Sequence, residues 1–183
     1  MRICVYCGSK NGNKTEYTDS AEKLGIALAK KGIGLVYGGG NSGMMGKISS
    51  TVLENGGEVI GVIPETLSRR CKSGPELSQV YTVNNIHERK SLMMELSNGF
   101  VAMPGGLGTF EEILEVINWA QLKIHNKPYG FLNTHNYFGK MFDLIDHIAD
   151  EGFMKKDHKE TILVDETPEK LIAKIVQRID PAE

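Results

Sequence analysis

The stretch VAMPGGLGTFEEILEVINWAQ, residues 101–121, decides the fold because it holds a complete strand, turn and helix. It opens with an apolar run, breaks at Gly105, Gly106 and Gly108, and continues with apolar residues at helical spacing. A short apolar run that gives way to a 3.6-residue period is typical of a buried strand leading into an amphipathic helix. We therefore ask whether this unit repeats along the chain.

Short runs rich in Val and Ile alternate with longer amphipathic segments over the whole sequence. We expect strands over 2–8, 33–39, 58–63, 79–83, 99–105, 127–133 and 161–166, and helices near 15–31, 43–55, 85–98, 109–123, 137–150 and from 168 onward. Residues 65–78 should form a loop with about one helical turn. Nearly continuous apolar strands separated by helices indicate a mainly parallel sheet with helices on both faces. The sequence predicts one α/β domain over residues 1–183, with a doubly wound sheet.

Composition and charge exclude several classes of protein. The chain has 183 residues and a net charge of −2, so there is no electrostatic reason to expect binding to nucleic acid or to an anionic membrane surface. No apolar stretch approaches the roughly 20 residues of a membrane span. The N-terminal segment lacks a secretory apolar region and cleavage site. We expect a cytoplasmic protein.

The cysteines and histidines give no sign of a disulfide framework or a metal centre. There are three cysteines, Cys4, Cys7 and Cys71. Cys4 and Cys7 lie in an expected strand, where their odd separation points them to opposite faces. We expect packed thiols rather than a redox pair. The five histidines are dispersed, and no metal-ligand spacing is present.

Two glycine segments follow the first two expected strands, where ligands of open parallel sheets bind. Gly8 and Ser9 follow the first strand, although an ordinary turn also explains them. The loop 38–46, which includes Gly39 and Gly40, follows the second strand and allows close approach of the backbone to a ligand. Its match to G-x-G-x-x-G is a weak indication of dinucleotide binding, since no acid clearly ends the next strand.

Residues 101–121 allow two competing interpretations. The turn at 104–108 precedes a helix that we expect to start at Thr109, and free N–H groups there favour an anion. Thr109 and Glu112 match the capping box T-x-x-E, in which Glu112 would cap the helix rather than act in chemistry. However, Glu112 and Glu115 share one helical stripe with Trp119, and two carboxylates beside an indole are unusual for a core face.

A pair of cations begins the helix after residues 79–83. Arg89 and Lys90 lie within its first two turns, where the helix dipole disfavours them, so a nearby anion would offset their charge. A solvated face with Glu88 as local compensation is the simpler alternative. Together with the glycine segments and carboxylates, the cations suit a small phosphorylated ligand. Carboxylates also stabilise the oxocarbenium-like cation that forms when a bond at a sugar carbon breaks.

Four motifs match one known family. PGGLGTFEE (104–112) fits the signature P-G-G-x-G-T-x-x-E, and HERK (87–90) fits an R-K motif. YGGGNSGMMG (37–46) and CGSKNG (7–12) fit two further glycine segments. Over nearly its whole length the chain resembles the LONELY GUY (LOG) family of cytokinin riboside 5′-monophosphate phosphoribohydrolases, which are often mislabelled lysine decarboxylases.

The resemblance implies a function and a set of site residues. It implies a Rossmann-like homodimer that hydrolyses the N-glycosidic bond of N6-substituted AMP, or of AMP, to the free base and ribose 5-phosphate, with no metal or organic cofactor. Arg89 and Glu112 would be the catalytic pair. The residues expected to bind or surround the nucleotide are Gly8, Ser9, Gly39, Gly40, Lys90, Gly105, Gly106, Gly108, Thr109 and Glu115. The chain departs from the family's usual residues at Ile86, Cys71 and Lys123.

Two other functions remain open from the sequence, and a third is not supported by it. A non-catalytic nucleotide-binding or cofactor-carrier protein could share this fold, and it would bind a nucleotide without releasing its base. An NAD-dependent oxidoreductase is suggested only by the glycine loop at 38–46. A lysine decarboxylase would need pyridoxal phosphate, and no residue is marked as a Schiff-base lysine.

Overall fold

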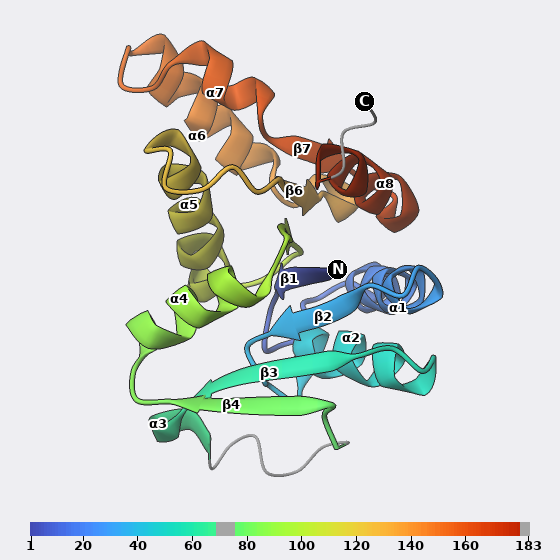
Figure 1. The fold of residues 1–183 in the computed structure, drawn as a ribbon. Helices are drawn as coiled ribbons and strands as arrows, with labels where there is room; N and C mark the ends of the chain where they lie inside the picture. Colours follow the sequence, from blue (N-terminus) through green and yellow to red (C-terminus); the bar gives the residue numbers. More distant parts are fainter. Residues whose placement is uncertain (69–75, 180–183) are drawn as a thin grey trace.

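Seven parallel strands form a single sheet in the computed structural model, which describes residues 1–68 and 76–179 (Figure 1). The strands are β1 (Arg2–Tyr6), β2 (Gly34–Tyr37), β3 (Val59–Pro64), β4 (Gln79–Val83), β5 (Gly99–Ala102), β6 (Tyr129–Leu132) and β7 (Leu163–Asp165). Their order across the sheet is β4-β3-β2-β1-β5-β6-β7, and every neighbouring pair is parallel. The predicted doubly wound α/β fold is confirmed.

The helices largely follow the predicted segments. They are α1 (Thr15–Lys30), α2 (Gly43–Glu54), α3 (Glu65–Ser68), α4 (Ile86–Leu96), α5 (Leu107–Gln121), α6 (Gly139–Asp150), α7 (Lys156–Glu160) and α8 (Pro168–Ile179). The short α3 is the single helical turn expected in the loop after β3. The sequence did not predict α7 or the 3-10 turn Thr134–Asn136, because segments this short carry no readable helical period.

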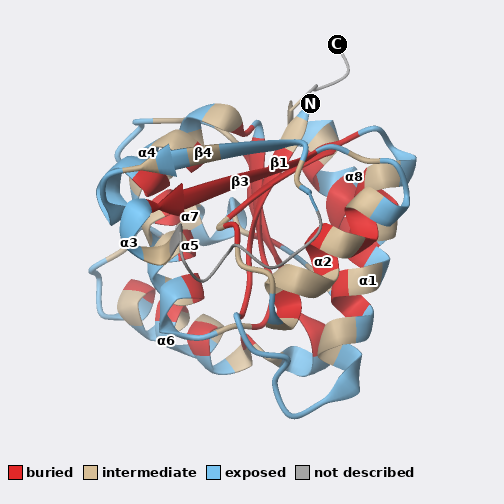
Figure 2. Cartoon of the chain, turned by 90° about the horizontal axis from the view of Figure 1, so that it is seen from below, coloured by how far each residue is buried: buried red, intermediate tan, exposed pale blue. Residues whose placement is uncertain are grey.

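Two hydrophobic cores lie on opposite faces of the sheet (Figure 2). One is filled from α1, α2 and α8, and the other from α4, α5 and α6. Strand β1 contributes to both, because its side chains alternate between the faces: Ile3 and Val5 pack into the first core, and Cys4 and Tyr6 into the second. Parallel strands covered on both faces explain the continuous apolar runs in the sequence.

The two described cysteines are packed as predicted. Cys7 lies in the first core and Cys4 in the second, and each is at most 3% exposed. Burial raises the pKa of both thiols well above the usual range, so they remain protonated. The opposite placement of Cys4 and Cys7 confirms that they are not a redox pair. Cys71 lies outside the described residues.

The predicted start of α5 is wrong by two residues. The helix begins at Leu107 with Gly106 as its N-cap, and Thr109 is already inside its first turn. The Thr109 N–H donates to Gly106 O at 3.0 Å, so it is not available for a side chain of Glu112. The prediction that Thr109 and Glu112 form a capping box is therefore also wrong. Gly106 can take the extended N-cap conformation, at φ −89° and ψ −164°, without any side-chain cap.

The direction of the chain reverses between β1 and β5. From β1 the chain builds outward through β2, β3 and β4, and it then returns to add β5 on the other side of β1. The carboxyl ends of β1 and β5 thus form the topological switch point, where ligands of such sheets bind. The Gly8 N–H after β1 donates to Pro104 O after β5 at 3.1 Å, which joins the two turns. Within the described ranges, no helix is long and apolar enough to cross a membrane.

Candidate active site

The glycine turn between β5 and α5 is held tightly on its inner side. A Cβ on Gly105 would lie 2.1 Å from Thr109 Oγ1 and 2.8 Å from Gly8 N, so only glycine fits there. The Tyr137 hydroxyl donates to Gly105 O. Thr109 is 3% exposed and supports the turn from inside the helix. The structure thus brings the predicted residues Gly8, Gly105 and Thr109 into one packed unit.

The outer side of the same turn is open. No acceptor among residues 1–68 and 76–179 pairs with the main-chain N–H groups of Gly105, Gly106, Leu107 and Gly108. A Cβ added at Gly106 or Gly108 would meet nothing within 4 Å. These N–H groups lie at the positive end of the helix dipole of α5. We call residues 105–108 the anion seat, because such a helix start favours a phosphate or carboxylate.

The glycine loop after β2 packs against the turn after β1. Gly43 has φ +62°, and a Cβ there would lie 2.3 Å from the carbonyl carbon of Ser9. The Ser42 hydroxyl donates to Ser9 O at 3.3 Å, and the Met45 N–H donates to Gly8 O at 3.2 Å. The predicted segments around Ser9 and Gly43 therefore form one continuous floor beside the switch point.

Within this loop, Gly38 makes room for a catalytic candidate. A Cβ at Gly38 would lie 1.9 Å from Arg89 Nη2, so the guanidinium occupies the space that a side chain would fill. The predicted ligand contacts Gly39 and Gly40 face the side chains of Ile63 and Met45 instead. No local pattern in the sequence predicts the contact between Gly38 and Arg89, because Arg89 comes from α4, a distant part of the chain.

Arg89 and Glu112 form a buried ion pair. Arg89 Nη2 lies 3.5 Å from Glu112 Oε1, and the side chains are 10% and 11% exposed. Burial raises the pKa of Glu112 to about 7, and the nearby Arg89 charge only partly opposes this effect. Arg89 Nε is buried and has no hydrogen-bond partner among the described residues. The pair is thus loosely joined, and the guanidinium keeps one buried donor that no group in the described part of the chain satisfies.

Lys90 is buried between two further carboxylates. Its Nζ lies 2.5 Å from Glu111 Oε1 and 3.0 Å from Glu115 Oε2. Burial by itself lowers the pKa of Lys90, but the hydrogen bonds to Glu111 and Glu115 outweigh burial and raise it. Arg89 and Lys90 are each 8% exposed, so the alternative in which they form a solvated charged face is wrong. Glu88 instead accepts hydrogen bonds from Asn84 at the start of α4.

Two of the three positions that depart from the family's usual residues, Ile86 and Lys123, lie at helix ends, and the third, Cys71, is outside the described residues. Ile86 is the first residue of α4 and is 41% exposed. Lys123 follows the end of α5 with φ +59°, a left-handed conformation that favours glycine.

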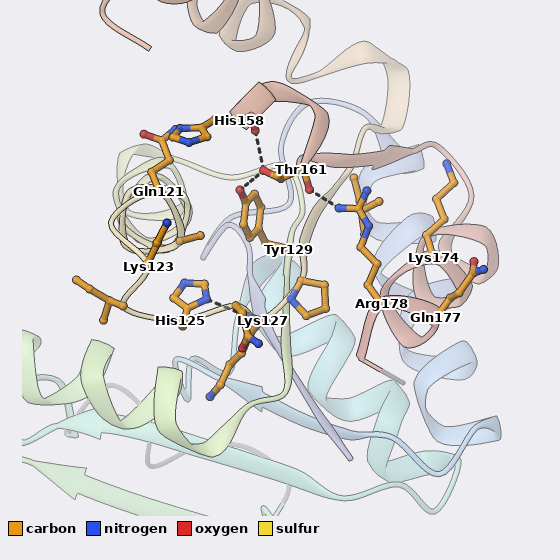
Figure 3. Close-up of a pocket in the computed structure, with 15 residues that line it drawn as sticks. Gln121, Lys123, His125, Lys127, Tyr129, His158, Thr161, Lys174, Gln177 and Arg178 are labelled. Carbon is orange, nitrogen blue, oxygen red and sulfur yellow. Dashed lines mark hydrogen bonds between the residues drawn. The ribbon is translucent and has the colours of Figure 1, made fainter. Parts of the chain in front are cut away.

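A cavity lies among β6, β7 and the segments that lead into them, away from the switch point (Figure 3). It has a volume of about 1290 Å³ and is lined at the amino ends of β6 and β7, where Tyr129 and Leu163 begin these strands. Two of its cations are held by main-chain oxygens: Lys127 Nζ donates to Met94 O at 2.7 Å, and Arg178 Nη1 donates to Thr161 O at 2.7 Å. None of the predicted site residues lines it.

The polar groups around the switch point are main-chain N–H groups, two cations and several carboxylates. In the described part of the chain, no group of three or more His, Cys, Asp or Glu side chains is placed to hold a metal ion. The arrangement can hold an anion at the start of α5 and present a buried carboxylate near it.

Solved structures share the fold. A Moco carrier protein from Chlamydomonas reinhardtii aligns with a TM-score of 0.73 at 23% identity, covering 99% of this chain and 98% of its own. A molybdenum cofactor binding protein from Rippkaea orientalis aligns with a TM-score of 0.72 at 20% identity, covering 97% and 96%. At this identity the likeness shows the fold alone.

Proteins found by sequence similarity share a much higher identity with this chain than these solved structures do. The cytokinin riboside 5′-monophosphate phosphoribohydrolase LOG of Oryza sativa subsp. japonica is 45% identical over 178 residues, covering 97% of this chain and 74% of that protein. The phosphoribohydrolase LOG1 of Arabidopsis thaliana is 46% identical over 174 residues, covering 95% and 82%. A family model described as "Possible lysine decarboxylase" matches residues 45–175. The chain therefore belongs to the LOG family, the family of the cytokinin riboside 5′-monophosphate phosphoribohydrolases.

Proposed function

We propose that this protein hydrolyses the N-glycosidic bond of a purine nucleoside 5′-monophosphate, either N6-substituted AMP or AMP itself. The products are the free base and ribose 5-phosphate. The observation that carries the proposal is the buried pair of Arg89 on α4 and Glu112 on α5, 3.5 Å apart. The names of the relatives, which describe this reaction, support it.

The 5′-phosphate would bind at the anion seat. Four main-chain N–H groups that have no acceptor in the described ranges, together with the dipole of α5, favour a dianion there. The floor formed by Gly8, Ser9 and the loop 38–46 would then lie under the rest of the nucleotide. Gly39 and Gly40 allow the loop to pack closely against Ile63 and Met45, because a Cβ at either position would overlap these side chains.

Glu112 would act at the ribose. As the bond between C1′ and the base nitrogen breaks, the electron pair leaves with the base and C1′ becomes positive. The Glu112 carboxylate stabilises that charge and accepts a proton from the water whose oxygen bonds to C1′. The base takes up a proton from solvent as it leaves, and Glu112 then returns its proton to solvent, so the carboxylate is restored. Arg89, with its unpaired Nε, orients the nucleotide and offsets the negative charge that develops on the base.

Lys90 and Glu115 would support this site. The Lys90 ammonium has three N–H donors, and Glu111 and Glu115 occupy two of them. One donor remains for an oxygen of the nucleotide, which is compatible with the predicted role of Lys90 in binding. Glu115, which is partly exposed, can accept a hydrogen bond from a ribose hydroxyl.

Separate substitutions of Glu112 and its neighbour Glu111 test whether Glu112 is the catalytic carboxylate. The protein is incubated with AMP and with isopentenyladenosine monophosphate, and free base is measured. Glu112→Gln should lower the rate about 100-fold or more. Glu111→Gln is the matched control, since Glu111 is half exposed and points to Lys90, and it should reduce the rate far less. No base release by the unmodified protein, or equal losses in both variants, would contradict the assignment.

The non-catalytic alternative predicts a different result. A nucleotide-binding or cofactor-carrier protein would bind AMP with no release of adenine over any incubation time. The same incubation therefore separates the two functions.

A homodimer, implied by the family resemblance, is also part of the proposal. Leu107, Leu114 and Leu122 recur along one side of α5 at intervals of seven and eight residues and are 89%, 43% and 62% exposed. An apolar stripe of this kind suits an interface with a second copy. Light scattering should give the mass of a dimer, and Leu114→Glu should shift it toward the monomer. The cytoplasmic location stays a prediction.

A further inference from the structure

Tyr137 reaches the anion seat from a distant part of the chain. It lies between the 3-10 turn and α6, and its hydroxyl donates to Gly105 O, 32 positions earlier. Its ring meets the ring of Tyr17 edge-on, with centroids 5.7 Å apart and planes at 79°. It also meets the Phe138 ring at 5.0 Å and 88°. The position of the hydroxyl is therefore fixed by packing as well as by the hydrogen bond.

The hydrogen bond to Gly105 O determines the direction of an N–H group. In a trans peptide the C=O and the following N–H point in opposite directions, and the described residues contain no cis peptide. When Tyr137 holds the Gly105 carbonyl, the Gly106 N–H must point away from Tyr137. In the same way, the bond from Gly8 N to Pro104 O turns the Gly105 N–H away from Gly8. Two N–H groups of the anion seat are thus aimed by groups outside the turn.

The loop that delivers Tyr137 is conformationally unusual. His135 and Asn136 are consecutive non-glycine residues, and each has φ +53°. Asn133 braces them: its Nδ2 donates to Asn136 Oδ1 at 3.0 Å, and its Oδ1 accepts from Phe138 N at 2.9 Å. Left-handed conformations at such residues persist only when the surroundings enforce them, and they collect at functional sites.

We propose that Tyr137 is a positioning residue for the phosphate of the substrate. Its hydroxyl locks the Gly105–Gly106 peptide so that the Gly106 N–H points into the anion seat, and the braced loop at 133–138 places that hydroxyl. The proposal rests on the proposed function for the identity of the anion. It goes beyond that function because Tyr137 belongs to none of the four matched motifs.

The substitution Tyr137→Phe removes the hydroxyl and keeps the ring. The dissociation constant for ribose 5-phosphate, measured by calorimetry, should rise about fivefold, as expected for the loss of one orienting hydrogen bond. The binding of adenosine, which has no phosphate, should stay the same. The KM for AMP should rise by a similar factor while kcat changes little. Tyr17→Phe is the matched control, because its neighbouring hydroxyl has no partner among the described residues, and it should leave all three values unchanged.

Hydrogen exchange gives a second measurement that depends on neither binding nor turnover. In Tyr137→Phe, the amides of Gly8, Thr109 and Phe110, which donate to carbonyl groups of this turn, should exchange faster than in the unmodified protein and in Tyr17→Phe. Unchanged ribose 5-phosphate binding, or an equal loss of ribose 5-phosphate and adenosine binding, would overturn the proposal. Absence of ribose 5-phosphate binding to the unmodified protein would overturn it too. Failure to release base, with phosphate binding still dependent on Tyr137, would instead contradict the hydrolase function alone.

Discussion

Arg89 Nη2 lies 3.5 Å from Glu112 Oε1, and the two side chains are only 10% and 11% exposed. The separation is too long for a strong hydrogen bond, so the arginine does not fully compensate for the burial of the carboxylate. Glu112 is consequently held near the midpoint of its titration at neutral pH. Such a group can exchange a proton during turnover, and its ionisation affects both activity and stability.

The activity should depend on pH through Glu112. The pKa of this carboxyl is raised to about 7, and the ionised form is the one that stabilises a ribosyl cation. We expect kcat/KM for AMP to rise as the pH increases through about 7 and to level off above it. Measurements between pH 5 and 9 test this expectation. A rate that falls over the same interval would mean that the protonated form is active.

The stability should change with pH in the opposite direction. The pKa of Glu112 is raised from 4.5 to about 7 on folding, so the folded state binds the proton more tightly than the unfolded state. Between these values the free energy of unfolding falls as the pH rises, and above about 7 it stays low. Glu112→Gln should remove up to about 3 kcal/mol of this pH dependence.

Urea unfolding at pH 5 and pH 8 measures the difference. Relative to the unmodified protein, Glu112→Gln should gain stability between the lower and the higher pH. A change in stability that is equal at both pH values would show that the pKa of Glu112 is not raised on folding.

Gly38 should control the position of Arg89. Gly38→Ala would place a Cβ 1.9 Å from the present position of Arg89 Nη2, and the flexible guanidinium would move away from it. We expect a loss of kcat of about tenfold or more, with little change in the unfolding midpoint. A double-mutant cycle with Arg89→Ala checks the cause, since Gly38→Ala should add almost no further loss in that background. Additive losses would show that Gly38 acts independently of Arg89.

The substitution Gly108→Ala should raise the stability of the protein and weaken its binding of the nucleotide phosphate. Gly108 lies in the first turn of α5, and a Cβ there meets no atom within 4 Å. Gly108→Ala should stabilise the protein by up to about 1 kcal/mol because alanine favours the helix. It should also weaken ribose 5-phosphate binding, because the methyl group enters the anion seat.

Gly105→Ala is the contrasting variant. Its Cβ would lie 2.1 Å from Thr109 Oγ1, so it should lower the unfolding midpoint. If Gly108→Ala stabilises the protein and leaves ribose 5-phosphate binding unchanged, the phosphate does not bind at the start of α5.

The sheet could be predicted because each strand is a short apolar run between turn residues. The start of α5 could not, because Thr109 and Glu112 satisfy a capping pattern while Gly106 has the actual cap geometry. The burial of Arg89 and Lys90 also escaped the sequence, since it depends on α5 packing beside α4. The bond between Tyr137 and Gly105 joins residues 32 positions apart across a left-handed loop, and no local pattern reports it.

The most direct test of the account is the product balance with AMP. The unmodified protein should release adenine and ribose 5-phosphate in equal amounts, and Glu112→Gln should release both at least about 100-fold more slowly while it still binds ribose 5-phosphate. Chromatography of both products over one time course gives the answer. Binding of AMP without adenine release would contradict the hydrolase function. Adenine release by Glu112→Gln at the unmodified rate would contradict the role of Glu112 in breaking the N-glycosidic bond.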